Sequence, residues 1–284
     1  MCRLLTRRRT VRRRTGGRRA ASAPARRERL GESTAGGDDR GGNFAGTRVG
    51  ILCRIVSDVG AVVGRVDGDL ADPKVIEQVY ALCAGDGPVL VESGPGSTLA
   101  ALTRGLTDIG FTPSDVRHVF LTHAHLDHIA GLPMLIDSIF TDEVDIPVTV
   151  YGRAETLKAI QDHLFNWVIW PDFAVLPNPE NPMLRYQVCN PGDTVTIGHR
   201  HFHAVDVAHS VPAIGYTVQN SGGVFAVSGD TKTNETLWPV LNACDDLRVL
   251  VIEVSFPNEM AQLANDAGHY CPNTLVKDLQ RLPG

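Results

Sequence analysis

The chain has 284 residues, of which 43% are hydrophobic, an ordinary composition for a globular protein of one or two domains. Its net charge of −5 is unevenly distributed: residues 1–30 hold 12 of the 27 Lys and Arg and one of the 32 acids, which leaves a net charge of −16 on residues 31–284. An acidic body disfavours binding of a long polyanion such as RNA. The sequence also lacks a run of 18 apolar residues, so it predicts no membrane span.

Residues 1–44 are rich in Arg, Gly and Ala, so we predict that they form a disordered N-terminal extension. Three interpretations stay open: an organellar transit peptide, a basic arm for nucleic acid or anionic lipid, and translated upstream sequence without a role, which we favour. No apolar region follows the arginines, which argues against a secretory signal. The six cysteines form no Cys-x-x-Cys pair, which favours free thiols and a cytoplasmic location, with organellar and exported locations still open.

Strand-like runs and helix-like periodicity alternate from about residue 48 onward. The first clear strand, 89–92, ends at a Ser-Gly-Pro-Gly turn, and Ser97 can cap a helix that extends to about residue 109. The further expected elements are strand 118–122, helix 129–140, strand 148–151, helix 154–165, the proline-rich loop 171–182, and strands 201–209, 213–218, 224–227 and 249–254. This order predicts an α/β protein with two sheets flanked by helices.

The heptad 122–128 reads Thr-His-Ala-His-Leu-Asp-His and directly follows a short apolar run. In an extended segment His123 and His125 project to the same side, and Asp127 and His128 follow in the turn, where they can face a neighbouring point. Neutral imidazole nitrogens and carboxylate oxygens are ligands that Zn²⁺ prefers. The alternative is a surface turn that is rich in histidine by chance, and so dense a motif argues against it. We therefore predict two neighbouring metal positions.

This heptad resembles the signature of the metallo-β-lactamase superfamily, a fold of hydrolases. Other stretches are similar to the class II cyclic-nucleotide phosphodiesterases, above all the tryptophan-containing segment 165–173 and the run Glu-Val-Ser-Phe-Pro-Asn at 253–258. The remaining similar stretches are 128–133, 179–182, 209–216 and 228–231. The resemblance extends from about residue 118 to about residue 275, and it implies a four-layer αββα fold in one metallohydrolase domain, residues 45–284.

The resemblance also implies a centre with two zinc ions. The implied ligands are His123, His125 and His209 for the first ion, Asp127 and His128 for the second, and Asp230 as the bridge. Related tRNA 3′-processing ribonucleases carry a proton-donating His in a comparable segment, which implies that His269 is the general acid. The family's later Thr-His-Leu-Lys-Pro type segment has no counterpart before Gly284, so we expect the fold to lack the last strand and helix. Either the sequence is a fragment, or the second site is incomplete or recruits His269.

Other polar and aromatic residues are weaker candidates. Glu92 occupies the place of an Asp that in relatives orients a metal-bound His. It is equally open whether Glu92 keeps that role or has lost it through sequence drift. Glu253 either supports the centre or is a buried structural acid. The alternation of apolar and polar residues predicts that His199, His201 and His203 face solvent. A nucleobase could stack on His163, Trp167 and Trp170, but packing is the commoner role of such side chains.

The leading hypothesis is a phosphodiesterase that hydrolyses 3′,5′-cyclic nucleotides (cAMP before cGMP) to nucleoside 5′-monophosphates. Two zinc ions would activate a hydroxide, with Asp127 helping to hold it and His269 protonating the 3′-oxygen that leaves. The alternatives are a ribonuclease Z-like enzyme acting on RNA, a metal-binding but inactive truncated homologue and, from the heptad alone, a lactamase or thioesterase. The expected partner is a small cyclic nucleotide rather than a nucleic acid or a membrane, and oligomerisation stays open.

Overall fold

The computed structural model describes residues 50–55, 62–65, 74–75, 79–84, 87–141 and 145–282. These residues all belong to one compact unit, Phe44–Gly284. The predicted disorder of residues 1–44 lies outside the described residues, and the domain division at residue 44 stays a prediction. No helix in the described part of the chain is long and apolar enough to span a membrane.

Seven strands form the first sheet, in the order β3-β2-β4-β5-β6-β7-β8. Their bounds are β3 Lys74–Val75, β2 Val62–Arg65, β4 Tyr80–Ala84, β5 Gly87–Val91, β6 His118–Phe120, β7 Val148–Gly152 and β8 Leu184–Val188. Strands β5 to β8 pair in parallel, and parallel neighbours need crossover connections. The crossovers contain α1 (Leu99–Asp108), α3 (Gly131–Ser138) and α4 (Ala154–His163). The loops that follow β5, β6 and β7 therefore meet at one edge, the carboxyl edge of this sheet.

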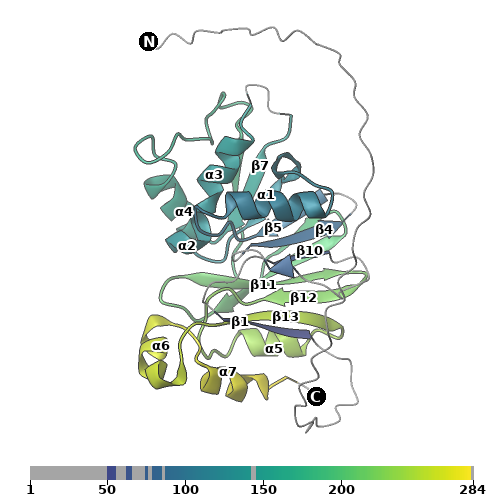
Figure 1. Cartoon of the computed structure of the whole chain (residues 1–284), viewed down its shortest axis with the longest axis vertical. Helices are drawn as coiled ribbons and strands as arrows, with labels where there is room; N and C mark the ends of the chain where they lie inside the picture. The colour runs from purple at the N-terminus through teal and green to yellow at the C-terminus, as the bar shows by residue number, and fades with distance from the viewer. Residues whose placement is uncertain are drawn as a thin grey trace, which may run out of the picture. The chain divides into compact units, whose positions relative to one another are not determined.

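Six strands form the second sheet, in the order β1-β13-β12-β11-β10-β9. Their bounds are β1 Gly50–Ile55, β13 Leu247–Val254, β12 Gly223–Val227, β11 Ala213–Asn220, β10 Arg200–Val207 and β9 Thr194–Ile197. Strands β9 to β12 pair antiparallel, whereas β13 pairs in parallel with both β12 and β1. On the side of β13 lie α5 (Leu237–Asn242), α6 (Ala261–Ala267) and α7 (Pro272–Leu279), as Figure 1 shows.

Three hydrophobic clusters fill the spaces between four layers of secondary structure. The first cluster joins the seven-stranded sheet to α1, α3 and α4, and the third joins the six-stranded sheet to α5 and α7. The middle cluster contains side chains of both sheets. At its centre the ring of Phe120 stacks between those of Tyr151 and Phe202, with centroid distances of 4.3 and 4.2 Å. The order helix, sheet, sheet, helix confirms the predicted αββα fold, and the expected lack of a last strand and helix stays a prediction.

The elements predicted from residue 89 onward are confirmed, with small shifts at their ends. The helix predicted over 129–140 is α3, which begins two residues later and ends two residues earlier, and a separate short helix, α2 (Leu126–Ile129), precedes it. Pro133 has no N–H to donate to the carbonyl of Ile129, so the hydrogen bond that would join α2 to α3 across Ala130 cannot form. Strands β4, β8 and β9 and helices α5, α6 and α7 were not predicted from the sequence. Strands β8 and β9 do alternate apolar and polar residues, but they are only five and four residues long and most of their side chains are exposed or half-buried.

We expect Phe120→Ala to lower the free energy of unfolding by about 3–5 kcal/mol, because it removes a fully buried ring from the stack between the sheets. The matched control is Phe140→Ala, since that ring is 37% exposed beyond the end of α3 and its loss should cost clearly less. Denaturant unfolding followed by circular dichroism measures both variants. Equal losses would contradict the role of the stack.

Candidate metal centre

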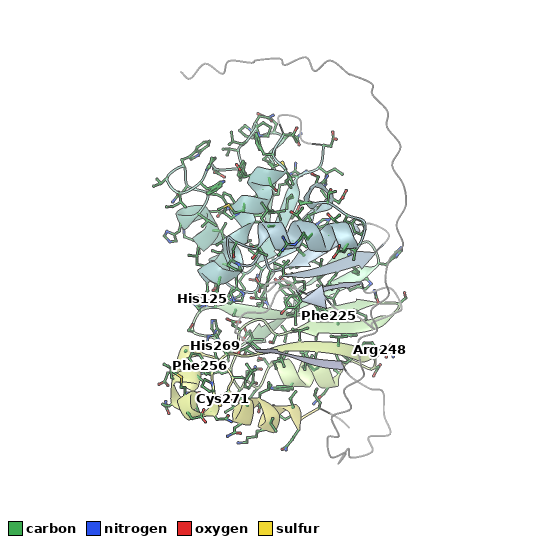
Figure 2. The ribbon with its side chains drawn as sticks, in the orientation of Figure 1. His125, Phe225, Arg248, Phe256, His269 and Cys271 are labelled. Atoms are coloured by element: carbon green, nitrogen blue, oxygen red, sulfur yellow. The ribbon has the colours of Figure 1, made fainter. Side chains whose placement is uncertain are left out.

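The predicted ligands lie on loops that belong to both sheets. The loop after β6 carries the heptad 122–128, the turn after β10 carries His209, and the loop after β12 carries Asp230. His269 follows α6, near the end of the described chain. Figure 2 shows His125 and His269 on the same side of the molecule, and the rings of both contact the ring of His209.

Two hydrogen bonds fix the start of the heptad against β11. The main-chain N–H of Ile214 donates to the carbonyl oxygen of Thr122 at 3.0 Å. The buried hydroxyl of Tyr216 donates to the carbonyl oxygen of Leu121 at 2.9 Å. Because the two bonds join one sheet to the other, the heptad keeps a set position relative to His209, which precedes β11 by four residues.

The first group of ligands consists of His123, His125 and His209, whose nitrogens lie within 4.8 Å of one another. Nε2 of His209 is 3.1 Å from Nδ1 of His125. Nε2 of His123 is buried and has no hydrogen-bond partner among the described residues. Burial lowers the pKa of His123 to about 2 and also lowers the pKa of His209, so that these rings stay neutral and keep a lone pair. Converging neutral imidazoles fit a divalent metal ion.

The second group is built around His128, which is fully buried. Its Nε2 lies 3.3 Å from Oδ2 of Asp230 and 3.6 Å from Oδ2 of Asp127, and its Nδ1 lies 3.2 Å from Oε1 of Glu92. Burial lowers the pKa of His128, but the charge of Glu92 and the contact with Asp230 outweigh burial and raise it to about 10. A metal ion at Nε2 would therefore displace a proton. Carboxylates on either side of an imidazole also fit a divalent cation.

Asp230 connects the two groups, as expected of a bridging ligand. Its Oδ2 lies 4.0 Å from Nε2 of His123, 3.3 Å from Nε2 of His128 and 4.0 Å from Nδ1 of His269. A third set of neighbouring donor atoms consists of His209, Asp230 and His269. The structure thus brings together His123, His125, His128, His209, Asp230 and His269, with Asp127 at their exposed side. The roles of ligand and acid within this set stay predictions.

Glycines allow the ligand loops to approach each other closely. Gly229 has a φ of +61°, and a Cβ on it would lie 2.8 Å from the side chain of Thr122, so only a glycine lets the loop before Asp230 pass this close to Thr122. Gly268 has a φ of +82°, and a Cβ there would lie 2.9 Å from the main chain of His209. The carbonyl oxygen of Gly268 accepts the Nδ1–H of His209 at 2.9 Å. This hydrogen bond leaves Nε2 of His209 as the lone-pair nitrogen that faces the centre.

Glu92 retains a supporting role. Its buried carboxylate accepts a hydrogen bond from the hydroxyl of Thr122 through Oε1, the same oxygen that faces His128. Since the Thr122 hydroxyl donates to Glu92, it can accept the Nδ1–H of His123, 2.9 Å away. One carboxylate therefore orients two candidate ligands, His128 directly and His123 through Thr122. Glu253 likewise accepts from Nδ1 of His269 at 3.0 Å.

The remaining histidine and tryptophan candidates lie elsewhere. His199 and His201 are exposed and His203 is half-buried, as expected of solvent-facing residues. The helix α4 starts directly after β7 and runs back along the sheet before β8 begins in parallel. Trp167 and Trp170 follow α4, so they lie at the edge opposite the metal centre, where Trp170 packs against the first hydrophobic cluster. This position argues against base stacking on these rings, and the packing of Trp170 agrees with the role that was favoured for it.

Comparison with known proteins agrees with the resemblance read from the motifs. Residues 89–284 match the family model of the beta-lactamase superfamily domain. The chain belongs to this superfamily. A probable 3′,5′-cyclic-nucleotide phosphodiesterase of Yersinia pestis is 26% identical over 249 residues, which cover 76% of this chain and 70% of the relative. A 3′,5′-cyclic-nucleotide phosphodiesterase of Aliivibrio fischeri is 33% identical over 195 residues, which cover 62% of this chain and 56% of the relative.

Other comparisons concern the fold and a second enzyme class. The crystal structure of unliganded yeast PDE1 superimposes with a TM-score of 0.57 at 20% identity, covering 78% of this chain and 81% of that chain, which supports the fold. Ribonuclease Z of Pyrococcus abyssi is 28% identical over 130 residues, 45% of this chain and 37% of the relative. The predicted resemblance to the metallo-β-lactamase superfamily and its cyclic-nucleotide phosphodiesterases is confirmed.

The sequence reading missed two supporting residues, Thr122 and Gly268. Thr122 opens the heptad, and its hydroxyl lies beside the first ligand, so the motif itself contained the signal. Gly268 directly precedes a predicted site histidine, and a glycine there is the mark of a left-handed cap at the end of a helix, here α6. Its contact with His209 joins residues 59 positions apart, which a local pattern cannot show.

We expect Glu92→Gln to weaken metal binding by about 10–100-fold, because the amide cannot accept as a charged carboxylate does from Thr122 and His128 together. Competition with a chromophoric chelator measures the affinity. Asp278→Asn is the matched control. Asp278, which lies in α7, is also a buried acid, and it accepts a hydrogen bond from the hydroxyl of Tyr270. Unchanged metal affinity in Glu92→Gln, or an equal loss in both variants, would contradict the supporting role.

Proposed function

We propose that the chain is a zinc-dependent phosphodiesterase that hydrolyses 3′,5′-cyclic nucleotides, cAMP first, to nucleoside 5′-monophosphates. The observation that carries this proposal is the convergence of five imidazoles, from loops of both sheets, around the buried carboxylate of Asp230. Relatives named 3′,5′-cyclic-nucleotide phosphodiesterase support the substrate class. Zinc is the metal we propose because imidazole nitrogens predominate among the donors.

His123, His125 and His209 would hold one zinc ion, and Asp127 and His128 the other, with Asp230 between them. When bound, two such ions lower the pKa of water and neutralise charge on the phosphoryl oxygens. Asp127 reaches the centre from its exposed side, with a half-exposed side chain, which suits a group that accepts a hydrogen bond from the attacking water. Attack on phosphorus opposite the 3′-oxygen then breaks the bond between phosphorus and that oxygen.

His269 would supply the proton that the departing 3′-oxygen requires. Its Nδ1 is held by the buried carboxylate of Glu253, which also accepts from the main-chain N–H groups of Thr231 and Tyr270. These bonds fix the ring, so that Nε2 is the nitrogen available for proton transfer. The ring of His269 lies 4.8 Å from that of His209, between centroids, which places the proposed acid beside the first group of ligands.

A ribonuclease is the second candidate, because 45% of this chain is similar to a ribonuclease Z. The net charge of −16 on residues 31–284 argues against it, since binding of a long RNA depends on Lys and Arg that neutralise phosphates. A small cyclic nucleotide carries a single charge and needs only the local field of bound metal ions.

We expect His123→Ala to lose zinc and to abolish hydrolysis of cAMP, because it removes a buried ligand of the first group. His201→Ala is the control, since that imidazole is exposed on β10 and should leave both properties unchanged. Elemental analysis and chromatography of 5′-AMP on the same samples measure the two effects. Surviving turnover in His123→Ala would refute the metal-dependent mechanism, and wild-type cleavage of a precursor tRNA without cleavage of cAMP would favour the ribonuclease.

We expect His269→Ala to lower kcat by about 10²–10⁴-fold while zinc content stays at the wild-type value, because general acid catalysis contributes rate acceleration of that order. Steady-state kinetics and elemental analysis of the same preparation measure the two quantities. A loss of zinc in this variant would instead make His269 a ligand, in keeping with its place beside His209 and Asp230.

A further inference from the structure

Phe256 is a half-buried aromatic residue that packs into none of the three hydrophobic clusters of the described residues. Its ring instead lies 5.5 Å from the ring of His269, between centroids, at an interplanar angle of 52°. Figure 2 shows Phe256 and His269 next to each other on the side where His125 also lies. A large apolar ring that contributes to no core yet borders the proposed acid needs another explanation.

The backbone holds Phe256 in a set position relative to His269. The N–H groups of Ser255 and Phe256 both donate to the carbonyl oxygen of Tyr270, at 3.1 and 3.3 Å. The following turn, Asn258–Met260, is tied to α7, because the side chain of Asn258 accepts from the N–H of Asn273 at 2.8 Å. The main chain of Phe256 and the turn after it are therefore both hydrogen-bonded to residues 270–273. These bonds hold the ring beside His269.

We propose that Phe256 is a substrate-binding residue on which the nucleobase of the bound nucleotide stacks. The inference rests on the proposed function, in which His269 gives its proton to the ribose 3′-oxygen. The base is attached to C1′ of that same ribose, two carbons from the 3′-carbon, so it lies within reach of a ring that borders the acid. Aromatic rings stack on the π-face that every base has, with little preference among bases. Phe256 thus takes the role that Trp167 and Trp170 cannot take from the opposite edge.

The test compares two substrates with the zinc-loaded full chain: cAMP and the abasic 3′,5′-cyclic ribose phosphate, which has the same reacting ring without a base. We expect Phe256→Ala to raise KM for cAMP about tenfold or more, with a smaller change in kcat. KM for the abasic compound should stay at the wild-type value, and Phe256→Trp should restore KM for cAMP. Trp167→Ala is the control, because its ring is 62% exposed at the far edge and should leave both substrates unaffected.

An unchanged KM for cAMP in Phe256→Ala would overturn the proposal. An equal loss with both substrates would also overturn it, since it would show that Phe256 only supports His269. If the wild-type chain hydrolyses neither cyclic phosphate, the proposed function fails, and calorimetry still decides the role of Phe256. In that case AMP should bind the wild-type chain at least tenfold more tightly than ribose 5-phosphate does, and Phe256→Ala should remove that difference; equal binding of AMP to both chains would refute the stacking role.

Discussion

The candidate metal centre depends on the face-to-face packing of the two sheets, because its proposed ligands come from both. Phe120 ends β6, and its ring is held between Tyr151 of the same sheet and Phe202 of the other. The position of this ring fixes where β6 ends relative to the other sheet, and His123 follows three residues later. Protein interiors are packed as densely as crystals of small organic molecules, so such a stack has little freedom to slide. The distances from His123 to Asp230 and His209 are therefore set by the core beneath them.

The pKa values of two neighbouring buried histidines shift in opposite directions, and this difference follows from where the carboxylates lie. His123 and His128 are both fully buried, and desolvation alone would lower the pKa of each. Only His128 has carboxylates close to both nitrogens, from Glu92 and Asp230, and these reverse the effect. His123 has the hydroxyl of Thr122 at Nδ1 and a more distant Asp230 at Nε2. The two groups therefore offer different environments to a cation: a mostly neutral one and an acidic one.

The sequence predicted those parts of the site that a short segment contains. The heptad brought together His123, His125, Asp127 and His128 because a strand end and a turn place such close neighbours around one point. His209 and Asp230 were found only through the family resemblance, since a single histidine or aspartate at a strand end has no distinctive local pattern. Fold prediction was limited in the same way. Strands with a continuous apolar run, such as β12 and β13, were found, whereas β8 and β9 are exposed on much of their surface and were not.

The contacts of residues that act through others could not be read from a local sequence pattern. Glu92 lies 30 positions before Thr122, and their contact exists only because β5 and β6 are parallel neighbours whose ends meet. Gly268 and His209 meet through the packing of the α6 end against the turn after β10. Phe256 belongs to a run that marked the subfamily, yet nothing local separates a ring at a site from a ring in a core. Only the contacts of Phe256 in the folded chain make that distinction.

The acidity of residues 31–284 bears on the size of the substrate in the proposed function. Glu92, Asp127, Asp230 and Glu253 all lie at or beside the proposed zinc sites, so the chain itself offers an anion little attraction. In the proposed function the attraction would come from bound cations, and at physiological ionic strength it would be screened beyond about 8 Å. An anion with one phosphodiester lies wholly inside that range. A long RNA would place most of its phosphates outside it, over an acidic surface. The same charges that would hold metal ions at the proposed centre would thus favour a substrate small enough to be bound by those ions alone.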